Sequence, residues 1–280
     1  MSKAPTSSST LTHHGAGDAR VDALRLIAQG EAAVLVTVVQ TQGSVPREAG
    51  TRMLVTAEHS YATIGGGHLE WRAIAMARQM LRLETIEAAV HHFALGPALG
   101  QCCGGALTLS FQALTPAQID AWPAPEPRFH LQLYGAGHVG RAIANLLSTL
   151  NVSVDWIDER AAEFPSGDLP RHIRKVAVDS VEGEVRLAPP GALYLVLTHQ
   201  HDLDMRITEA ILRRGDFGFL GLIGSHTKHQ RFVHRFEERG MAPELIARIT
   251  CPIGIHGIVG KEPEVIAVAV VAQLLSLKTV

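Results

Sequence analysis

The chain has 280 residues, which corresponds to two domains at roughly 150 residues per domain. Hydrophobic residues make up 46% of the chain and charged residues 19%, a globular composition that excludes a mainly disordered protein. The net charge is −2 and aromatic residues amount to 5%, so we expect no binding to nucleic acid and none to a membrane. The apolar run over residues 265–272 is too short to cross a bilayer core of roughly 30 Å.

Residues 1–17 are rich in Ser and Thr and lack the apolar segment of a secretory signal, so we expect a disordered tail. The chain has three cysteines, two of them adjacent, and these cannot form a disulfide framework. Both observations predict a cytoplasmic, reduced protein. Residues 122–128 contain three prolines and are predicted to be a linker between domains at 18–121 and 129–280.

The domain at 18–121 is predicted to mix helices and strands in an α+β arrangement. Apolar periodicity predicts helices over 21–30 and 68–83, and strands over 32–40, 51–56, 61–64, 85–93 and 106–114. Loops that contain glycine interrupt these elements in three places, at 41–50, 65–67 and 95–105.

The domain at 129–280 alternates strands and helices. We expect strands over 129–134, 152–158, 175–179, 192–198 and 217–223, and helices over 139–149, 203–214, 227–239 and 263–277. This alternation predicts βαβ units. The fold class is therefore α/β, with a C-terminal Rossmann-like, doubly wound parallel sheet that follows a smaller α+β domain.

A glycine loop follows the first strand of the second domain. Gly135, Gly137 and Gly140 match the dinucleotide-binding pattern G-x-G-x-x-G, and the predicted helix over 139–149 follows. The glycines permit a tight turn, the approach of a pyrophosphate and close helix packing. Asp158 ends the next strand, where a ribose-binding carboxylate belongs. The alternative is a Rossmann domain that binds no nucleotide.

The most unusual motif is Gln-Cys-Cys-Gly-Gly, in which Cys102 and Cys103 precede Gly104 and Gly105. The glycines leave the thiols sterically open, and successive N–H groups in such a turn lower the pKa of a thiol. An open thiolate suits a soft metal or a persulfide. Cys102 and Cys103 are therefore candidates for metal binding and sulfur chemistry, although buried cysteines are often only small apolar residues.

Two further loops of the first domain carry candidate binding residues. Arg47 is suited to bind a phosphate, or alternatively to pair with its neighbour Glu48. A second loop runs from a strand into a helix and contains Gly65, Gly66, Gly67 and His68. Its glycines form either an anion-binding nest or a sharp turn with positive φ angles.

Polar motifs also follow two strands of the second domain, on the side where parallel sheets bind ligands. His199 and His201 lie in the first motif, where Asp202 is a candidate helix cap. In the second motif, Lys228 is a candidate phosphate contact and Ser225 a candidate cap.

Together these motifs resemble the xanthine dehydrogenase accessory proteins, the XdhC/CoxI family. The resemblance rests on the order and spacing of segments 43–55, 63–70, 95–105, 134–140, 158–160, 198–204, 221–228 and 251–255. It implies the same two-part layout, with a Rossmann-like C-terminal domain.

The resemblance also implies a chaperone for molybdenum cofactor (Mo-molybdopterin). Such a protein would take the cofactor from its biosynthesis proteins and hold it while a cysteine desulfurase exchanges an oxo for a sulfido ligand. It would then deliver the cofactor to apo-xanthine dehydrogenase, and it would be a homodimer. Cys102 or Cys103 would contact molybdenum or relay sulfur, and Arg47 with the glycine loops would hold the pterin or its phosphate. The Rossmann-like domain would hold that phosphate, a nucleotide form of the cofactor, or a separate dinucleotide.

Two other functions remain open from the residues alone. The glycine loop and Asp158 suit an NAD(P)-dependent oxidoreductase, although no Tyr-x-x-x-Lys pair accompanies them. The same residues suit a module that senses nucleotides without catalysis. Because the cofactor chaperone is the favoured function, we expect an accessory protein rather than an enzyme.

Overall fold

The computed structural model describes residues 19–83, 86–95, 104–122 and 126–277. The chain divides into two compact units, residues 1–124 and 125–280, so the division falls inside the Pro-rich segment. Trp122 belongs to the first unit: its ring is buried, Arg52 lies over it at 4.7 Å, and Arg20 Nε donates to its carbonyl oxygen. The expected tail at 1–17, and Cys102 with Cys103, lie outside the described residues.

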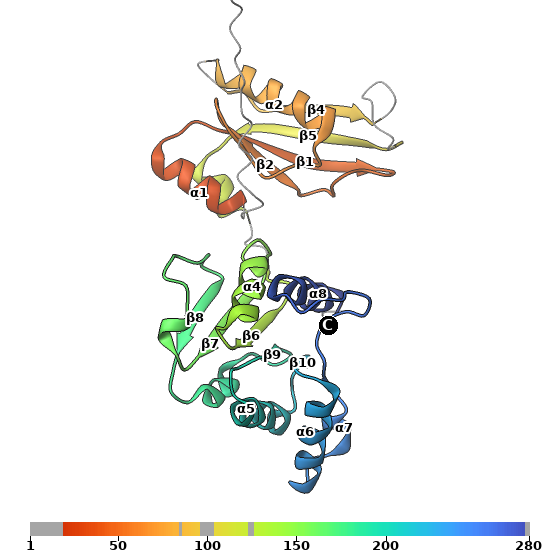
Figure 1. The fold of residues 1–280 in the computed structure, drawn as a ribbon. Coiled ribbons are helices and arrows are strands. Elements are labelled where there is room, and N and C mark those ends of the chain that lie inside the picture. The colour runs from red at the N-terminus through yellow and green to blue at the C-terminus, as the bar shows by residue number, and fades with distance from the viewer. Residues whose placement is uncertain (1–18, 84–85, 96–103, 123–125, 278–280) are drawn as a thin grey trace, which may run out of the picture. The chain divides into compact units, whose positions relative to one another are not determined.

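The N-terminal unit is a five-stranded antiparallel sheet with helices on both faces (Figure 1). The strand order is β3-β2-β1-β5-β4. The elements are α1 (Ala19–Gln29), β1 (Val34–Gln42), β2 (Arg52–Val55), β3 (Ser60–Tyr61), α2 (Gly67–Leu81), β4 (Ala89–Ala94), β5 (Ala106–Ala113) and α3 (Pro116–Asp120).

Successive apolar side chains of β1 point to opposite faces of the sheet, which explains why helices cover both faces. Val34, Val36 and Val38 point to the face that packs against α2, whereas Leu35 points to the face that packs against α1 and α3. Successive side chains of a strand point to opposite faces, so an apolar run of this kind needs cover on both sides. The predicted α+β character is confirmed, and the short helix α3 is an addition that the sequence did not predict.

The C-terminal unit contains a six-stranded, entirely parallel sheet of order β11-β10-β9-β6-β7-β8. Its elements are β6 (His130–Tyr134), α4 (His138–Leu147), β7 (Ser153–Asp158), η2 (Ala161–Glu163), β8 (Ile173–Ala177), η3 (Val181–Leu187), β9 (Leu193–Val196), α5 (His201–Arg214), β10 (Phe219–Leu222), α6 (His226–Glu238), α7 (Pro243–Ile246), β11 (Ile249–Thr250) and α8 (Pro263–Ser276). This order is that of doubly wound dinucleotide-binding sheets, with the switch point between β6 and β9.

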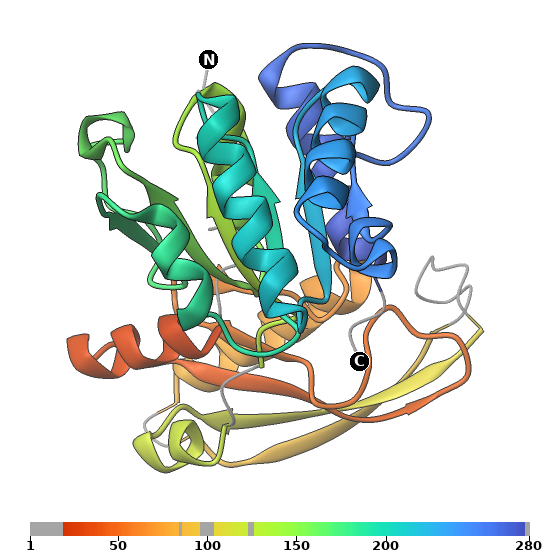
Figure 2. The ribbon, with the colours of Figure 1, turned by 90° about the horizontal axis from the view of Figure 1, so that it is seen from below.

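Helices cover both faces of the parallel sheet, which confirms the predicted doubly wound fold. The core on one face contains residues of α4 and α8, and the core on the other contains residues of η3, α5 and α6. Figure 2 shows α5 lying over the strands. The sixth strand, β11, was not predicted because two residues are too few to show a period. The predicted strand 175–179 is found two residues earlier, as β8.

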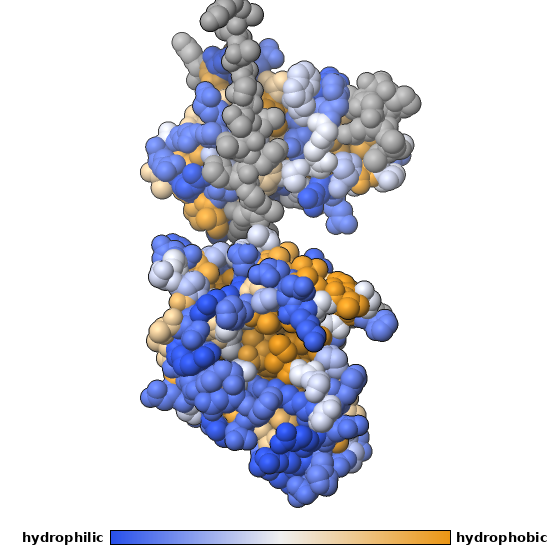
Figure 3. All heavy atoms as spheres, in the orientation of Figure 1, coloured by the Kyte–Doolittle hydropathy of each residue, from blue (hydrophilic) through white to orange (hydrophobic). Residues whose placement is uncertain are grey.

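Helix α8 is apolar around its whole circumference, unlike an ordinary surface helix. One side packs against α4 and the sheet, while Val268 and Leu275 stay 48% and 36% exposed. Figure 3 shows apolar residues gathered over this helix. Within the described ranges, no helix is long and apolar enough to pass through a bilayer.

Candidate functional site

Three loops of the N-terminal unit pack against one another where β1 ends and β5 begins. A side-chain Cβ on Gly105 would lie 2.3 Å from the carbonyl oxygen of Ser44, and one on Gly65 would lie 2.5 Å from Cβ of Pro46. Both separations are too short for any residue with a side chain, so glycine is required at these two positions. The loops at 43–47, 65–67 and 104–105 therefore form one loop cluster.

The predicted cysteine motif adjoins this loop cluster in the sequence. Cys102 and Cys103 lie outside the described residues and directly precede Gly104, which is exposed. Arg47 is exposed in the same cluster and forms no ion pair with Glu48, which is also among the described residues. Of the two alternatives for Arg47, the ion pair is therefore not observed. The guanidinium group remains available to an anionic ligand.

The glycine turn at 65–67 holds an internal carboxylate. Glu70 Oε2 accepts hydrogen bonds from Thr63 Oγ1 at 2.5 Å and from the backbone N–H groups of Ile64 and Gly66 at 3.0 Å. All three glycines have positive φ angles, between 66° and 120°. The sharp-turn alternative is thus observed, and the donors of Ile64 and Gly66 are occupied by the protein's own side chain. No local pattern in the sequence indicates this role of Glu70.

Beyond the turn, helix α2 begins with an exposed pair of flat rings. His68 stacks on Trp71 with ring centroids 5.5 Å apart and planes inclined by 26°. The Trp71 side chain is 65% exposed, which is unusual for so large an apolar group. Next to the loop cluster, this pair offers a flat surface for a ring of a ligand.

In the C-terminal unit, the three glycines of the loop after β6 have different roles. A Cβ on Gly135 would lie 2.4 Å from the carbonyl oxygen of Leu197, and one on Gly140 would lie 2.0 Å from that of Gly135. Packing therefore requires both. Gly137 precedes α4 with φ −71°, an ordinary angle for any residue, and a Cβ there would meet nothing within 4 Å. The open space beside Gly137 is what a phosphate approaching the backbone would need. His138 is the first residue of α4.

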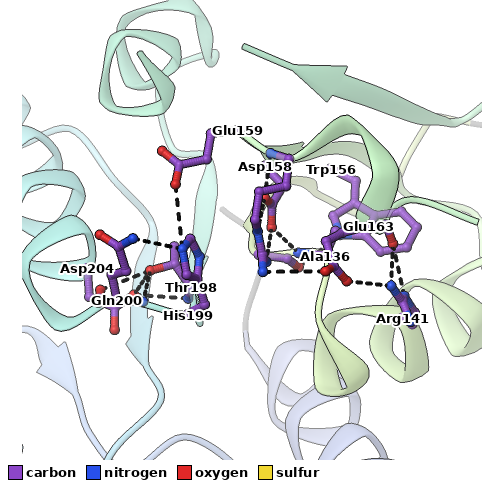
Figure 4. A network of polar contacts seen from close by, with 12 residues as sticks. Ala136, Arg141, Trp156, Asp158, Glu159, Glu163, Thr198, His199, Gln200 and Asp204 are labelled. Carbon is purple, nitrogen blue, oxygen red and sulfur yellow. Dashed lines mark hydrogen bonds and ion pairs between the residues drawn. The ribbon is translucent and has the colours of Figure 1, made fainter. Parts of the chain in front are cut away.

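Asp158 lies at the end of β7, as predicted, and holds the glycine loop in place (Figure 4). Its Oδ2 accepts from the N–H of Ala136 at 2.7 Å, and Arg160 donates to both carboxylate oxygens at 2.9–3.0 Å. Burial opposes the charged form, but these hydrogen bonds outweigh it and keep the pKa of Asp158 below its usual value. A ribose at the carboxylate would have to displace Arg160.

A second buried carboxylate, Asp204, bonds to Thr198 beyond the end of β9 (Figure 4) and pairs with Lys228 beyond the end of β10. Asp204, 1% exposed, accepts from Thr198 N at 2.9 Å and Thr198 Oγ1 at 2.7 Å, and it pairs with Lys228 Nζ at 2.6 Å. Lys228 Nζ also donates to the carbonyl oxygen of Ile223 at 2.8 Å. The predicted phosphate contact Lys228 is therefore committed to an internal ion pair, and sequence reasoning missed Asp204.

The helix caps next to this ion pair agree with the prediction in one of two cases. Ser225 accepts from Lys228 N at 3.3 Å and caps α6, as expected. Asp202 is not a cap, because α5 begins at His201 and its N-cap residue is Gln200. His199 Nε2 lies 2.9 Å from Gln200 Nε2 and 3.6 Å from Glu159 Oε1.

A cavity of about 410 Å³ opens between the ends of β9 and β10. Both predicted histidines, His199 and His201, line it together with Lys228. The described parts of the chain place no three His, Cys, Asp or Glu side chains where they would hold a metal ion. Of the residues predicted to bind a ligand in this unit, His199, His201 and Lys228 therefore lie around one cavity. Asp158 and the glycine loop do not line it.

These features define a two-domain protein with a Rossmann-type C-terminal unit and, in the N-terminal unit, a loop cluster that a cysteine pair directly precedes in the sequence. Residues 131–274 match the model of the XdhC Rossmann domain, and residues 26–93 match that of the XdhC and CoxI family. The chain belongs to this family, and the resemblance seen in the sequence is confirmed.

Individual relatives agree with this assignment. The chain is 30% identical over 270 residues to the uncharacterized protein YqeB of Escherichia coli K12, covering 92% of this chain and 46% of that protein. It is 28% identical over 156 residues to a protein of Bacillus subtilis 168 that is named as a probable subunit of xanthine dehydrogenase, covering 55% of this chain and 44% of that protein. The chain spans just under half the length of these curated relatives.

A solved structure from Bacillus halodurans, described as a xanthine dehydrogenase, shares the fold. The TM-score is 0.73 at 17% identity, and the match covers 93% of this chain and 96% of that one.

Proposed function

We propose that the protein is an accessory protein for the maturation of a xanthine dehydrogenase-type molybdoenzyme. Its cargo is molybdenum cofactor, which it holds during sulfuration and then delivers to the apoenzyme. A cysteine desulfurase supplies the sulfur as a persulfide, two electrons from a thiol reductant convert this sulfur to a sulfido ligand, and the displaced oxo ligand leaves as water. Membership of the XdhC and CoxI family supports this function. The relative named as a probable subunit of xanthine dehydrogenase supports that enzyme as the client.

The observation that carries the proposal is the loop cluster of the N-terminal unit. Gly105 packs closely against the backbone of Ser44, and Gly65 packs against the ring of Pro46, so three loops that are distant in the sequence form one surface. The cysteine pair directly precedes this surface in the chain. Gly105, two residues after Cys103, is buried and packs against the carbonyl oxygen of Ser44, so one end of the cysteine motif is held at the loop cluster.

The residues of the cluster match the chemistry of the cargo. A thiolate of Cys102 or Cys103 is a soft ligand for molybdenum or a carrier of sulfur. Arg47 provides an exposed cation for the phosphate of the pterin. The stacked rings of His68 and Trp71 provide a flat surface for the pterin itself.

A second function rests on the glycine loop of the C-terminal unit. The protein's own packing does not require glycine at position 137, whereas it does at 135 and 140. This difference supports binding of a phosphate-bearing nucleotide there, as an oxidoreductase or a nucleotide-sensing module would need. Against a dehydrogenase, Asp158 is occupied by Ala136 and Arg160.

The proposed function predicts activation of a client enzyme. Apo-xanthine dehydrogenase is incubated with the cofactor, a cysteine desulfurase, cysteine and a thiol reductant, with or without the full chain, and xanthine hydroxylation is measured. We expect the wild-type chain to raise the activity above that with free cofactor. In the Cys102→Ala/Cys103→Ala variant this increase in activity should be smaller by at least about tenfold. Losses of this size are typical when a residue that supports a metal site is removed.

Arg186→Gln serves as the control, since Arg186 is exposed on η3 and belongs to the C-terminal unit rather than to the unit that contains the loop cluster. Its variant should match wild type. If the wild-type chain activates the client no better than free cofactor does, the proposed function is wrong.

A further inference from the structure

We infer that the cavity between the ends of β9 and β10 binds a small molecule that contains both a flat ring and a phosphate group. The inference rests on residues of the C-terminal unit alone, whereas the loop cluster that carries the proposed function belongs to the N-terminal unit. The cavity volume of about 410 Å³ lies within the range of small-molecule sites. Its floor and its rim have different chemistry, and this difference defines the ligand.

The floor of the cavity is apolar. Met205 and Phe232 are 6% and 3% exposed, and Ile223 lies between the two strand ends. The buried pair of Asp204 and Lys228 adds no net charge, because the two groups neutralise each other at 2.6 Å. A floor of this kind gains dispersion contacts from a planar ring and provides no charge for it.

The rim of the cavity carries unpaired positive charge. Arg231 and Arg235 lie one turn apart on the exposed side of α6. Neither forms an ion pair within the described chain, and Arg235 contacts only the sulfur of Met205, at 3.6 Å. The arginines of this unit that do pair with a carboxylate are Arg141, Arg160, Arg174, Arg206, Arg213, Arg214 and Arg239.

The remaining charges on the rim do not cancel this pair of arginines. Asp202 is the one acidic lining residue besides Asp204. His199, which lies near Glu159, and His201 also line the cavity. Two guanidinium groups against one free carboxylate leave a net positive rim, which is suited to a phosphate dianion held by forked hydrogen bonds.

The probe for this site is adenosine monophosphate, in which a ribose joins a flat ring to a phosphate group. Titration calorimetry on the full chain compares it with adenosine and with inorganic phosphate. We expect adenosine monophosphate to bind more tightly than either part alone. The Arg231→Gln/Arg235→Gln variant should weaken its binding by about tenfold or more, because hydrogen bonds to charged groups are each strong enough for that change. Arg186→Gln, which removes a positive charge outside the cavity, should bind as wild type does.

Three results would contradict the inference. The first is equal binding of adenosine and its monophosphate, and the second is unchanged binding in the double arginine variant. The third is loss of binding in Gly137→Asp together with its retention in the arginine variant, which would place the ligand on the glycine loop.

The cargo is the other possible source of the same chemistry, since the pterin of molybdenum cofactor also carries a phosphate. Competition between free cofactor and adenosine monophosphate that persists in the Cys102→Ala/Cys103→Ala variant would assign the cavity to the cargo. Binding of the monophosphate without competition would assign it to a nucleotide. If neither the monophosphate nor the cofactor binds in a way that depends on Arg231 and Arg235, the inference fails, whatever the outcome of the client-activation experiment.

Discussion

Replacing Asp204 by leucine is expected to lower the free energy of unfolding of the C-terminal unit by about 3–5 kcal/mol, the cost of removing one partner of a buried ion pair. The change leaves the ammonium of Lys228, whose side chain is 11% exposed, without its counter-charge. It also leaves the N–H and hydroxyl of Thr198 without their shared acceptor. These groups join the ends of β9 and β10, so the loss of stability should be found in these two neighbouring strands.

The measurement is hydrogen exchange in β9 and β10 as a function of urea, which follows the C-terminal unit separately from the N-terminal one. Lys228→Met should be similarly destabilising, because it leaves Asp204 charged and buried. The double variant Asp204→Leu/Lys228→Met removes both charges and should recover much of the loss. Single variants within about 0.5 kcal/mol of wild type would show that the pair is not a stabilising link.

The glycine loop after β6 should respond in opposite ways at two of its positions. Gly140→Ala places a Cβ 2.0 Å from the carbonyl oxygen of Gly135, and we expect a loss of at least about 2 kcal/mol of stability. Gly137→Asp introduces a side chain into open space at a helix N-cap. Aspartate is a favourable cap there, so stability should be retained or should rise by up to about 1 kcal/mol.

Although Gly137→Asp should retain the stability of the fold, it should weaken the binding of a phosphate-bearing ligand. Its carboxylate would occupy the position of a phosphate and repel it, so binding of NADH, followed by its fluorescence, should fall by about tenfold or more. Gly137→Asn is the matched control, since asparagine has the same shape and also caps a helix, but carries no charge. Wild-type NADH affinity in Gly137→Asp would mean that the loop serves only the fold.

Much of the fold followed from local patterns in the sequence. Strands such as β1 and β6 are short, apolar and bounded by glycine or polar residues, so their limits were predicted to within a few residues. The alternation of strands and helices after residue 129 is sufficient to predict a doubly wound sheet. Elements without a full period, such as β11 and the 3-10 helix η3, gave no such signal.

The candidate sites were harder to predict, because their contacts join residues that are distant in the sequence. Glycine spacing predicted turns at 65–67 and 135–140, but no local pattern indicates that Glu70 fills the first turn or that Asp158 bonds to Ala136. Lys228 was a reasonable phosphate ligand by position alone. Its partner Asp204 lies 24 residues away, and only the parallel order of β9 and β10 brings the two together.

The most direct test of the cofactor-chaperone account is the molybdenum and pterin content of the reduced full chain after anaerobic mixing with free molybdenum cofactor and desalting. The account predicts near-stoichiometric retention of both, lost in the Cys102→Ala/Cys103→Ala variant, while hydrogen exchange in β1 and β5 stays as in wild type. Retention that is absent in the wild-type chain, or unchanged in the double cysteine variant, would contradict it.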